Sequence, residues 1–410
     1  MSTPMHASGV LDDKLLFMDM PTDPPGDTRN PYADYVGARR DHPVLIEQGR
    51  FGPDGPAVAF VYRHEDVVAV LHDHEVFSSR ALHDFMSPFM GDYVLVGMDE
   101  PAHARYRNLL APSMRPRLLA RWEDTLIGKV ADDLIDGIVA RGRGDLVADF
   151  NFSYPARIIA RIIGIPQDNY AQFQQWAVDI TAGVGDPVAG IASAQALRAY
   201  LAPFVAARRA EPEDDLISEL VRAEIDGDRL NDEEIYSFLL LLLPAGIETT
   251  YRSIGNLLFN LLSHPDQLEA VRNDRTLVAK AIDENLRIDS PIQTPPRLAA
   301  RDTEIRGIPI PAGTIVMPLI GSANHDPAFN DDPDRFDIFR PVVRHITFGN
   351  GVHTCMGLHL AKLETRIALN KLLDRLPGLR FDHDRVRALD AHMRGKAFRS
   401  PTALPVLWDS

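Results

Sequence analysis

Along most of the chain beyond residue 101, hydrophobic side chains recur every three or four positions, which predicts helices. One such stripe, which we expect to pack in the core, comprises Leu119, Trp122, Leu126, Val130, Leu134 and Ile138. The longest helix is predicted over 232–262, with Asn231 as its N-cap and His264-Pro265 at its end.

Short stretches that alternate hydrophobic and polar residues predict a few strands. They lie at 44–47 and 57–62, ahead of a helix around 67–71, and return at 297–318 and near the C-terminus. The pattern therefore predicts a mainly α fold with a minor β region. Since neither a linker nor a repeat divides the chain, we expect residues 31–410 to form a single large domain after a loosely ordered tail over 1–30.

Composition narrows the possible partners and the compartment. The net charge of −15 argues against binding to nucleic acid or to anionic membrane surfaces, because both require a basic face. The longest apolar run, from Phe238 to Ile247, is too short to span a bilayer, and the N-terminus carries no signal pattern. A single cysteine excludes a disulfide framework within the chain. We therefore expect a soluble, cytoplasmic protein.

That single cysteine, Cys355, lies in a loop that opens directly into a predicted helix. Phe348 precedes it by seven residues, Gly351 precedes it by four and Gly357 follows it by two. The glycines let a broad, flat group approach the backbone, and the free N–H groups of a helix N-terminus favour an anionic sulfur. A thiolate held in this way is a suitable axial ligand for heme iron.

A second unusual segment stands inside the longest predicted helix. Pro244 cannot donate a hydrogen bond to the Leu240 carbonyl and Gly246 has no side chain, so we expect the helix to kink or widen there. Such an opening can hold water or dioxygen. Glu248 and Thr249 follow it, and they supply a carboxylate and a hydroxyl for proton transfer.

In these residues the sequence resembles the cytochrome P-450 (heme-thiolate monooxygenase) superfamily. The cysteine loop matches its F-x-x-G-x-x-x-C-x-G motif, and the helix segment Ala245-Gly246-Ile247-Glu248-Thr249 matches its A/G-G-x-D/E-T motif. The resemblance implies heme b (iron protoporphyrin IX) between the long central helix and the cysteine-loop helix, with Cys355 as the iron ligand. Phe348, Gly349, Ala245 and Gly246 would contact the heme, while Thr249 would serve dioxygen and Glu248 proton delivery.

The resemblance also assigns residues around the heme. His103 and Arg107 match an H-x-x-x-R motif, and with Arg297 and His353 they are expected to bind the heme propionates. Glu284 and Arg287 match E-x-x-R, and Arg335 in Pro333-Asp-Arg335-Phe336 would complete a structural network behind the cysteine loop.

The substrate pocket is implied less sharply. Its expected walls include Leu82, Phe85, Met86, Phe89, Val94, Leu242, Ile292, Gln293, Thr294 and Phe398. Most of these residues are apolar, so a small apolar organic substrate is expected, with Gln293 and Thr294 available to orient a polar group. The glycine-bearing segment 183–190 is expected to be a mobile loop that belongs to an access lid.

Electrons must come from outside the chain, since no flavin or iron–sulfur domain is evident. The segment 101–122 contains five arginines and no acid, and with Lys362 and Arg366 it is expected to form a landing surface for an acidic carrier. By resemblance to the soluble bacterial members of the superfamily, the carrier is a [2Fe-2S] ferredoxin with its NAD(P)H-dependent reductase.

Three other interpretations remain open at this point. A peroxygenase driven by hydrogen peroxide would not need the pair Glu248 and Thr249. A heme-binding sensor would carry an output segment, and none is evident. His353, Cys355 and His359 could bind zinc, although their spacing is not typical of zinc sites.

Overall fold

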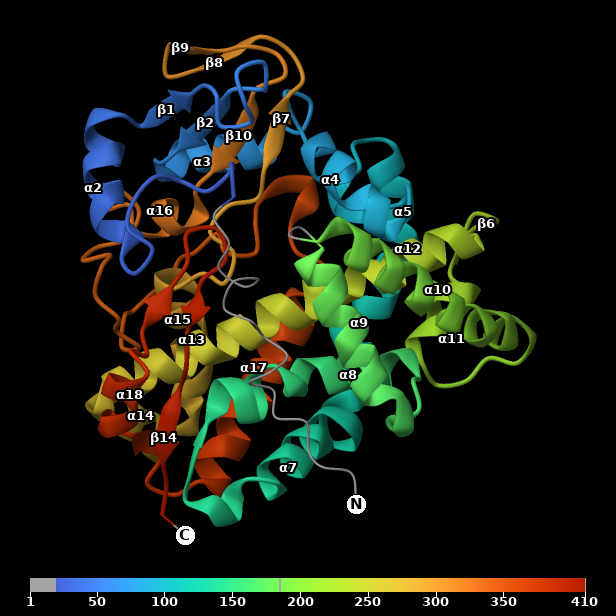
Figure 1. Cartoon of the computed structure of the whole chain (residues 1–410), viewed down its shortest axis with the longest axis vertical. Coiled ribbons are helices and arrows are strands. Elements are labelled where there is room, and N and C mark those ends of the chain that lie inside the picture. Colours follow the sequence, from blue (N-terminus) through green and yellow to red (C-terminus); the bar gives the residue numbers. More distant parts are fainter. Residues whose placement is uncertain (1–19, 184–185, 410) are drawn as a thin grey trace.

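The computed structural model describes residues 20–183 and 186–409, and it places a small sheet at one end of a large body of helices (Figure 1). Five strands form that sheet in the order β1 (Val44–Glu47), β2 (Val58–Val61), β10 (Ile315–Pro318), β7 (Arg297–Ala299) and β3 (Phe77–Ser78). All neighbours pair antiparallel except β2 and β10, which run parallel. The sheet thus joins segments that lie more than 200 residues apart in the sequence.

Helices account for most of the rest, as the hydrophobic pattern predicts. Those near the sheet are α2 (Pro31–Asp41), α3 (His64–His72), α4 (Arg80–Met90), α5 (Ala102–Leu110) and α16 (Ile320–Asn324). The helical body contains α6 (Pro116–Leu119), α7 (Gly128–Asp136), α8 (Ser153–Ile163), α9 (Tyr170–Ala182), α10 (Pro187–Ala210), α11 (Leu216–Arg222), α12 (Asp232–Leu242), α13 (Thr249–Ser263), α14 (Pro265–Asn273), α15 (Val278–Ile288), α17 (Leu358–Arg375) and α18 (His383–Ala388).

The remaining strands are short and peripheral. β11 (Arg380–Phe381), β14 (Pro405–Leu407) and β4 (Arg143–Asp145) form a three-stranded sheet. Three two-stranded ribbons consist of β5 (Glu224–Ile225) with β6 (Asp228–Arg229), β8 (Thr303–Ile305) with β9 (Ile308–Ile310), and β12 (Met393–Arg394) with β13 (Ser400–Pro401). The mainly α fold with a minor β region is therefore confirmed.

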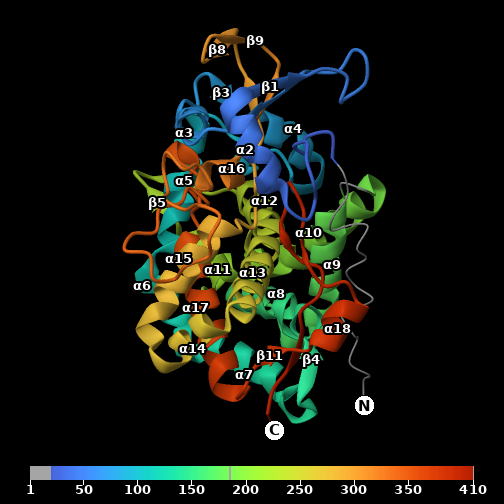
Figure 2. The ribbon, with the colours of Figure 1, turned by 90° about the vertical axis from the view of Figure 1, so that its left-hand side faces the viewer.

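The long central helix begins and ends close to the predicted residues, and it runs through the middle of the molecule (Figure 2). The Asn231 side chain accepts a hydrogen bond from the Glu234 N–H at 3.0 Å, and the Glu234 carboxylate accepts one from the Asn231 N–H at 2.8 Å. This reciprocal capping box fixes the start of α12. Between α12 and α13 the helix widens to a π-helical turn over Leu243–Glu248, where Pro244 and Gly246 predicted an opening.

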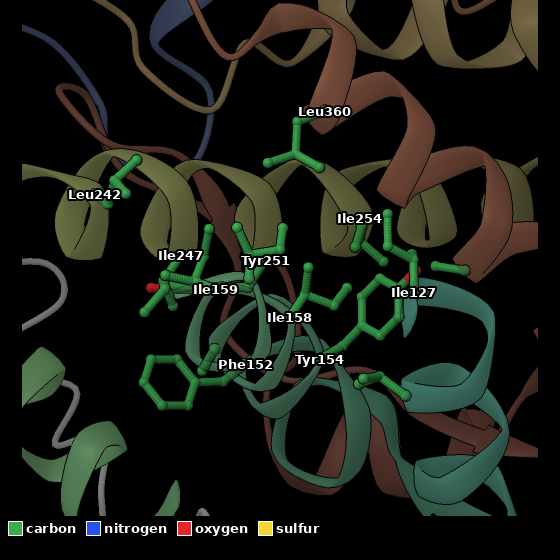
Figure 3. Close-up of a cluster of buried hydrophobic side chains, with 14 of the residues drawn as sticks. Ile127, Phe152, Tyr154, Ile158, Ile159, Leu242, Ile247, Tyr251, Ile254 and Leu360 are labelled. Atoms are coloured by element: carbon green, nitrogen blue, oxygen red, sulfur yellow. The ribbon is translucent and has the colours of Figure 1, made fainter. Parts of the chain in front are cut away.

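Apolar packing holds this helix in place on two sides. Figure 3 shows Ile247, Tyr251 and Ile254 pointing toward α8, which presents Tyr154, Ile158 and Ile159. On the opposite side α17 approaches with Leu360. Because α17 follows the cysteine loop directly, the same packing fixes the distance between that loop and the widened turn.

The core stripe, the N-terminal tail and the longest apolar helix each differ from what the sequence pattern indicates or are described only in part. The stripe from Leu119 to Ile138 is mostly buried, but it is divided among α6, a π-helical turn (Glu123–Ile127) and α7. Residues 1–19 of the predicted tail lie outside the described residues, and residues 20–30 contain no helix or strand. Within the described residues, α10 is the one helix long and apolar enough to cross a membrane, and it packs here against α9 and α11.

Candidate heme site

The cysteine loop is held in a tight conformation that presents the sulfur toward the interior. The Cys355 N–H donates a hydrogen bond to the Phe348 carbonyl at 2.8 Å, which closes the loop. Gly349 and Gly351 both adopt a φ of +77°, in the left-handed region that favours glycine. A Cβ on Gly351 would also lie 2.9 Å from the Leu71 carbonyl oxygen. Both its φ and this close approach therefore favour glycine at position 351.

We infer an internal cavity beside Cys355 from two properties of its side chain. Its side chain is accessible, yet burial is the largest influence on it and raises the pKa of the thiol. The N–H groups of Gly357 and Leu358 at the start of α17, together with Arg107, act in the opposite direction. An accessible surface in so desolvated a place belongs to the wall of an internal space.

The widened turn of the central helix also presents accessible surface, although most of that helix is buried. Ala245 is exposed and Thr249 is half-buried, whereas Leu243 and Ile247 are buried. The Thr249 hydroxyl donates a hydrogen bond to the Ala245 carbonyl at 2.7 Å, so it occupies the gap that the π-helical turn opens. A Cβ on Gly246 would lie 2.9 Å from Ile159, so this glycine permits close packing against α8.

Cationic and donor side chains converge beside the cysteine loop and outnumber the nearby acids, Glu100 and Asp99. His103 is buried and its Nδ1 lies 3.0 Å from a Glu100 carboxylate oxygen, but its Nε2 has no partner among the described residues. The ring of His353 lies 4.2 Å from that of His103, and its Nε2 is 2.9 Å from the Ser79 hydroxyl. Arg107 donates to the Thr354 carbonyl at 2.6 Å.

Arg297 completes this group and is the clearest sign of a missing anion. Its guanidinium is buried and donates to the Pro296 carbonyl at 2.9 Å. Burial lowers its pKa to about 10, and Asp99 is the acid that opposes this effect. Burial, followed by repulsion from Arg297, His103 and Arg107, lowers the pKa of His353 to about 3. The four side chains predicted for the propionates therefore suit two carboxylates that enter an otherwise apolar slot.

The predicted pocket residues do not all face the cavity. Phe85 and Phe398 retain 45% and 39% of their surface, as residues at an open space should. Leu82, Met86, Phe89 and Ile292 are half-buried, while Leu242 and Thr294 are almost fully buried.

Two of the pocket assignments are wrong. Val94 is fully buried in the main hydrophobic core and cannot contact a substrate. Gln293 is fully buried as well, and its amide donates to the Ser290 carbonyl at 2.6 Å and to the Tyr32 hydroxyl at 3.3 Å. Its amide oxygen lies against Gly321, where a Cβ would clash with it, so the amide does not point into open space.

The structural network behind the cysteine loop also needs a correction. Glu284 and Arg287 are fully buried and form a double hydrogen bond at 2.8 Å, as predicted. The third partner is Arg340, whose Nε donates to Glu284 at 3.0 Å. The Arg335 side chain is 61% exposed and pairs with Asp332 and Asp337, so only its carbonyl joins the network. Arg340 lies four residues beyond Phe336, outside the segment that resembles the family motif.

The predicted basic surface is smaller than the count of arginines suggests. Arg105 bridges Asp228 and Glu234, Arg121 pairs with Asp214, and Arg366 pairs with Glu123. Lys362 pairs with Asp283, and Arg107 turns inward. Arg115 and Arg117 are exposed and have no ion pair among the described residues.

The segment expected to act as a lid is described only in part. Gly183 follows α9 and Gly190 lies in the first turn of α10, whereas residues 184 and 185 lie outside the described residues. A Cβ on Gly183 or Gly190 would approach the Phe89 ring to 2.5 or 2.9 Å. The ring of Phe89 therefore sits directly on both glycines.

Comparison with known proteins agrees with this geometry. The family model "Cytochrome P-450" matches residues 190–383. Cytochrome P-450 107B1 of Saccharopolyspora erythraea is 38% identical over 295 residues, which cover 72% of each chain. The vitamin D(3) 25-hydroxylase of Pseudonocardia autotrophica is 35% identical over 86% of this chain and 87% of its own. The structure of CYP109E1 from Bacillus megaterium in complex with testosterone covers 93% of this chain and all of that one, with a TM-score of 0.84 and 29% identity.

The fold and the cavity define a heme-thiolate protein, and the chain belongs to the cytochrome P-450 family. It is a cytochrome P-450 monooxygenase, with heme as its cofactor and cysteine as the thiolate ligand. Within the described residues, no group of three or more His, Cys, Asp or Glu side chains could hold a metal ion, so the zinc interpretation has no support.

Proposed function

We propose that this monooxygenase inserts one oxygen atom of dioxygen into an apolar organic substrate, with electrons from a [2Fe-2S] ferredoxin and its NAD(P)H-dependent reductase. The observation that carries the substrate class is the accessible apolar surface of Phe85 and Phe398, two of the residues that we expect to line the pocket. Relatives with hydrophobic ligands, such as vitamin D(3) and testosterone, support the same class.

The roles of the individual residues follow from their positions. Cys355 would ligate the iron, and His103, Arg107, Arg297 and His353 would bind the propionates. When bound, the heme supplies the redox chemistry that activates dioxygen. This chain contributes a hydroxyl at Thr249 that is already oriented by the Ala245 carbonyl, and a carboxylate at Glu248 within the same turn. Phe348, Gly349, Ala245 and Gly246 would shape the slot around the heme.

The pair Glu248 and Thr249 favours a dioxygen-dependent enzyme over a peroxygenase or a sensor, because only the former requires protons to be delivered to the reacting oxygen. Product formation with ferredoxin, reductase and NADPH should exceed that with hydrogen peroxide alone. Product formation with hydrogen peroxide but none with ferredoxin, reductase and NADPH would refute the assignment.

A ligand screen tests the substrate class. We expect testosterone and hexadec-9-enoic acid to shift the heme absorption spectrum at lower concentration than charged hydrophilic compounds such as glucose 6-phosphate. Tighter responses from the hydrophilic set would contradict the proposal.

The donor would bind near Arg115 and Arg117, since these arginines remain free of ion pairs in the described part of the chain. Replacing both with glutamate should raise the KM for ferredoxin by about tenfold and leave testosterone binding unchanged. Arg375, which pairs with Asp136, is the matched control. We also propose that residues 31–410 act as one domain in the cytoplasm, without contacts to nucleic acid or membrane.

A further inference from the structure

Arg252 is a fully buried arginine one helical turn beyond Glu248, and the sequence alone assigned it no role. Its Nη2 donates to the Glu248 carboxylate at 2.8 Å, on the same face of α13. Glu248 itself is 7% exposed. An ionised carboxylate in so dry a place requires a fixed positive partner, and an arginine is always charged. Arg252 is thus placed to hold the Glu248 carboxylate and to point it along the helix.

The same guanidinium reaches the C-terminal segment that carries Phe398, one of the residues expected to line the pocket. Its Nη1 donates to the Ser400 hydroxyl at 2.9 Å. Its Cζ also lies 5.3 Å from the centre of the Phe398 ring, within the range of a cation–π contact. Phe398 is 39% exposed, so the single side chain of Arg252 contacts both the Glu248 carboxylate and an accessible ring that we expect at the pocket wall.

That wall is rigidly built, so a displacement in it would reach Arg252. Phe398 forms an isolated β-bridge with Ile292, and the Arg399 N–H donates to the Pro291 carbonyl at 3.0 Å. The Arg399 side chain is buried against Asp289 at 2.6 Å. Arg252 touches the Phe398 ring and the Ser400 hydroxyl of this segment, through a cation–π contact and a hydrogen bond, and both can transmit a displacement to it.

We propose that Arg252 is a positioning residue which holds the Glu248 carboxylate and couples its orientation to the pocket wall at Phe398 and Ser400. The proposal rests on the role of Glu248 in proton delivery. A substrate that presses on the Phe398 ring would loosen the grip of Arg252 and release Glu248 for proton transfer. The other titratable group that acts on Arg252 is Tyr251, on the same helix, while the C-terminal segment presents a ring and a hydroxyl.

The test compares four variants of the heme-loaded protein: Glu248→Gln, Arg252→Met, Arg252→Lys and Ser400→Ala. The first readout is the infrared C=O stretch of a protonated carboxylic acid at pH 7, recorded without turnover. Arg252→Met should gain such a band, because the buried carboxylate loses its cation, and the band should disappear in the double variant with Glu248→Gln. This subtraction also removes any buried acid that is common to both proteins.

The second readout is turnover with testosterone as the probe, ferredoxin and NADPH. We expect Glu248→Gln to lower kcat by about 10²-fold and Arg252→Met by about tenfold or more. Arg252→Lys retains the charge and should restore most of the rate. Ser400→Ala keeps the ion pair, so it should leave the infrared spectrum unchanged. It should also reduce probe dependence, the ratio of the NADPH consumption rate with testosterone to the rate without it.

The outcomes separate the two ideas. If Glu248→Gln lowers turnover while Arg252→Met neither lowers it nor gains the band, the role of Glu248 stands and the positioning role of Arg252 is refuted. If Glu248→Gln has no effect, the proton-delivery role falls and the coupling falls with it. If Arg252→Met fails to bind heme, the other two variants test the proposal. Unchanged probe dependence in Ser400→Ala together with a tenfold loss of kcat in Arg252→Lys would refute it.

Discussion

The replacement Glu364→Gln should stabilise the protein, and the gain should grow as the pH rises. Glu364 lies on α17 and is almost fully buried, and neither carboxylate oxygen has a hydrogen-bond partner among the described residues. Its carbonyl accepts a hydrogen bond from the Tyr154 hydroxyl at 3.1 Å, which fixes this part of α17 against α8. Burial raises the pKa of Glu364 well above its ordinary value of 4.5. We therefore expect the folded protein to keep this proton at a pH where the unfolded chain has lost it.

The magnitude follows from the proton that the folded state retains. Above pH 4.5 the unfolded chain ionises Glu364 freely while the folded chain does not, so the folded state binds more protons and loses stability as pH rises. The loss can reach about 1.4 kcal/mol per pH unit for as long as the folded state keeps the proton. Glutamine has nearly the same volume and also buries an amide in place of an acid, so the variant removes the titration and little else.

Thermal unfolding of the heme-loaded wild type and Glu364→Gln between pH 5 and 8 measures this difference. We expect nearly equal Tm values at pH 5 and an advantage for the variant that widens by on the order of 2 °C per pH unit. The exposed Glu75 supplies the control, and Glu75→Gln should show a constant difference. A constant difference for Glu364→Gln as well would mean that Glu364 ionises in the folded protein, which would refute the reasoning.

Three further predictions concern the network and the heme site. Arg340→Met should lower the free energy of unfolding by about 2–3 kcal/mol, because Glu284 loses a buried charged hydrogen bond. Arg335→Met should lower it by under about 1 kcal/mol, because its ion pairs are exposed. Chemical denaturation followed by heme absorbance compares the two variants, and equal effects would contradict the assignment. Cys355→Ser should abolish the carbon-monoxide spectrum of a thiolate-ligated heme, and a retained spectrum would exclude Cys355 as the ligand. Thr249→Ala should divert electrons from product to hydrogen peroxide, measured as peroxide released per NADPH, and unchanged coupling would refute its role.

The sequence was informative wherever a local pattern alone decides the conformation. The N-cap at Asn231 and the opening at Pro244 and Gly246 each depend on a few neighbouring residues, and both are found where they were predicted. The cysteine loop likewise opens directly into the predicted helix, α17. The division of the 119–138 stripe into short helices was not predictable, because periodicity reports which side chains face the core and says little about where a helix bends.

Long polar side chains were harder to place than apolar ones, and the errors share one physical cause. A hydrophobic residue is assigned by its own burial, whereas an arginine or glutamine can extend several ångströms toward any of several partners, so tertiary neighbours decide. Arg335 and Arg340 lie in the same loop, yet only the side chain of Arg340 turns inward to Glu284. In the same way, the Gln293 amide donates to the Tyr32 hydroxyl. The same uncertainty hid Arg252, although its position four residues after Glu248 was a usable signal for a helical ion pair. Where an acid is expected to move protons inside an apolar core, a search for its cation at helical spacing would therefore be a better guide than motif matching.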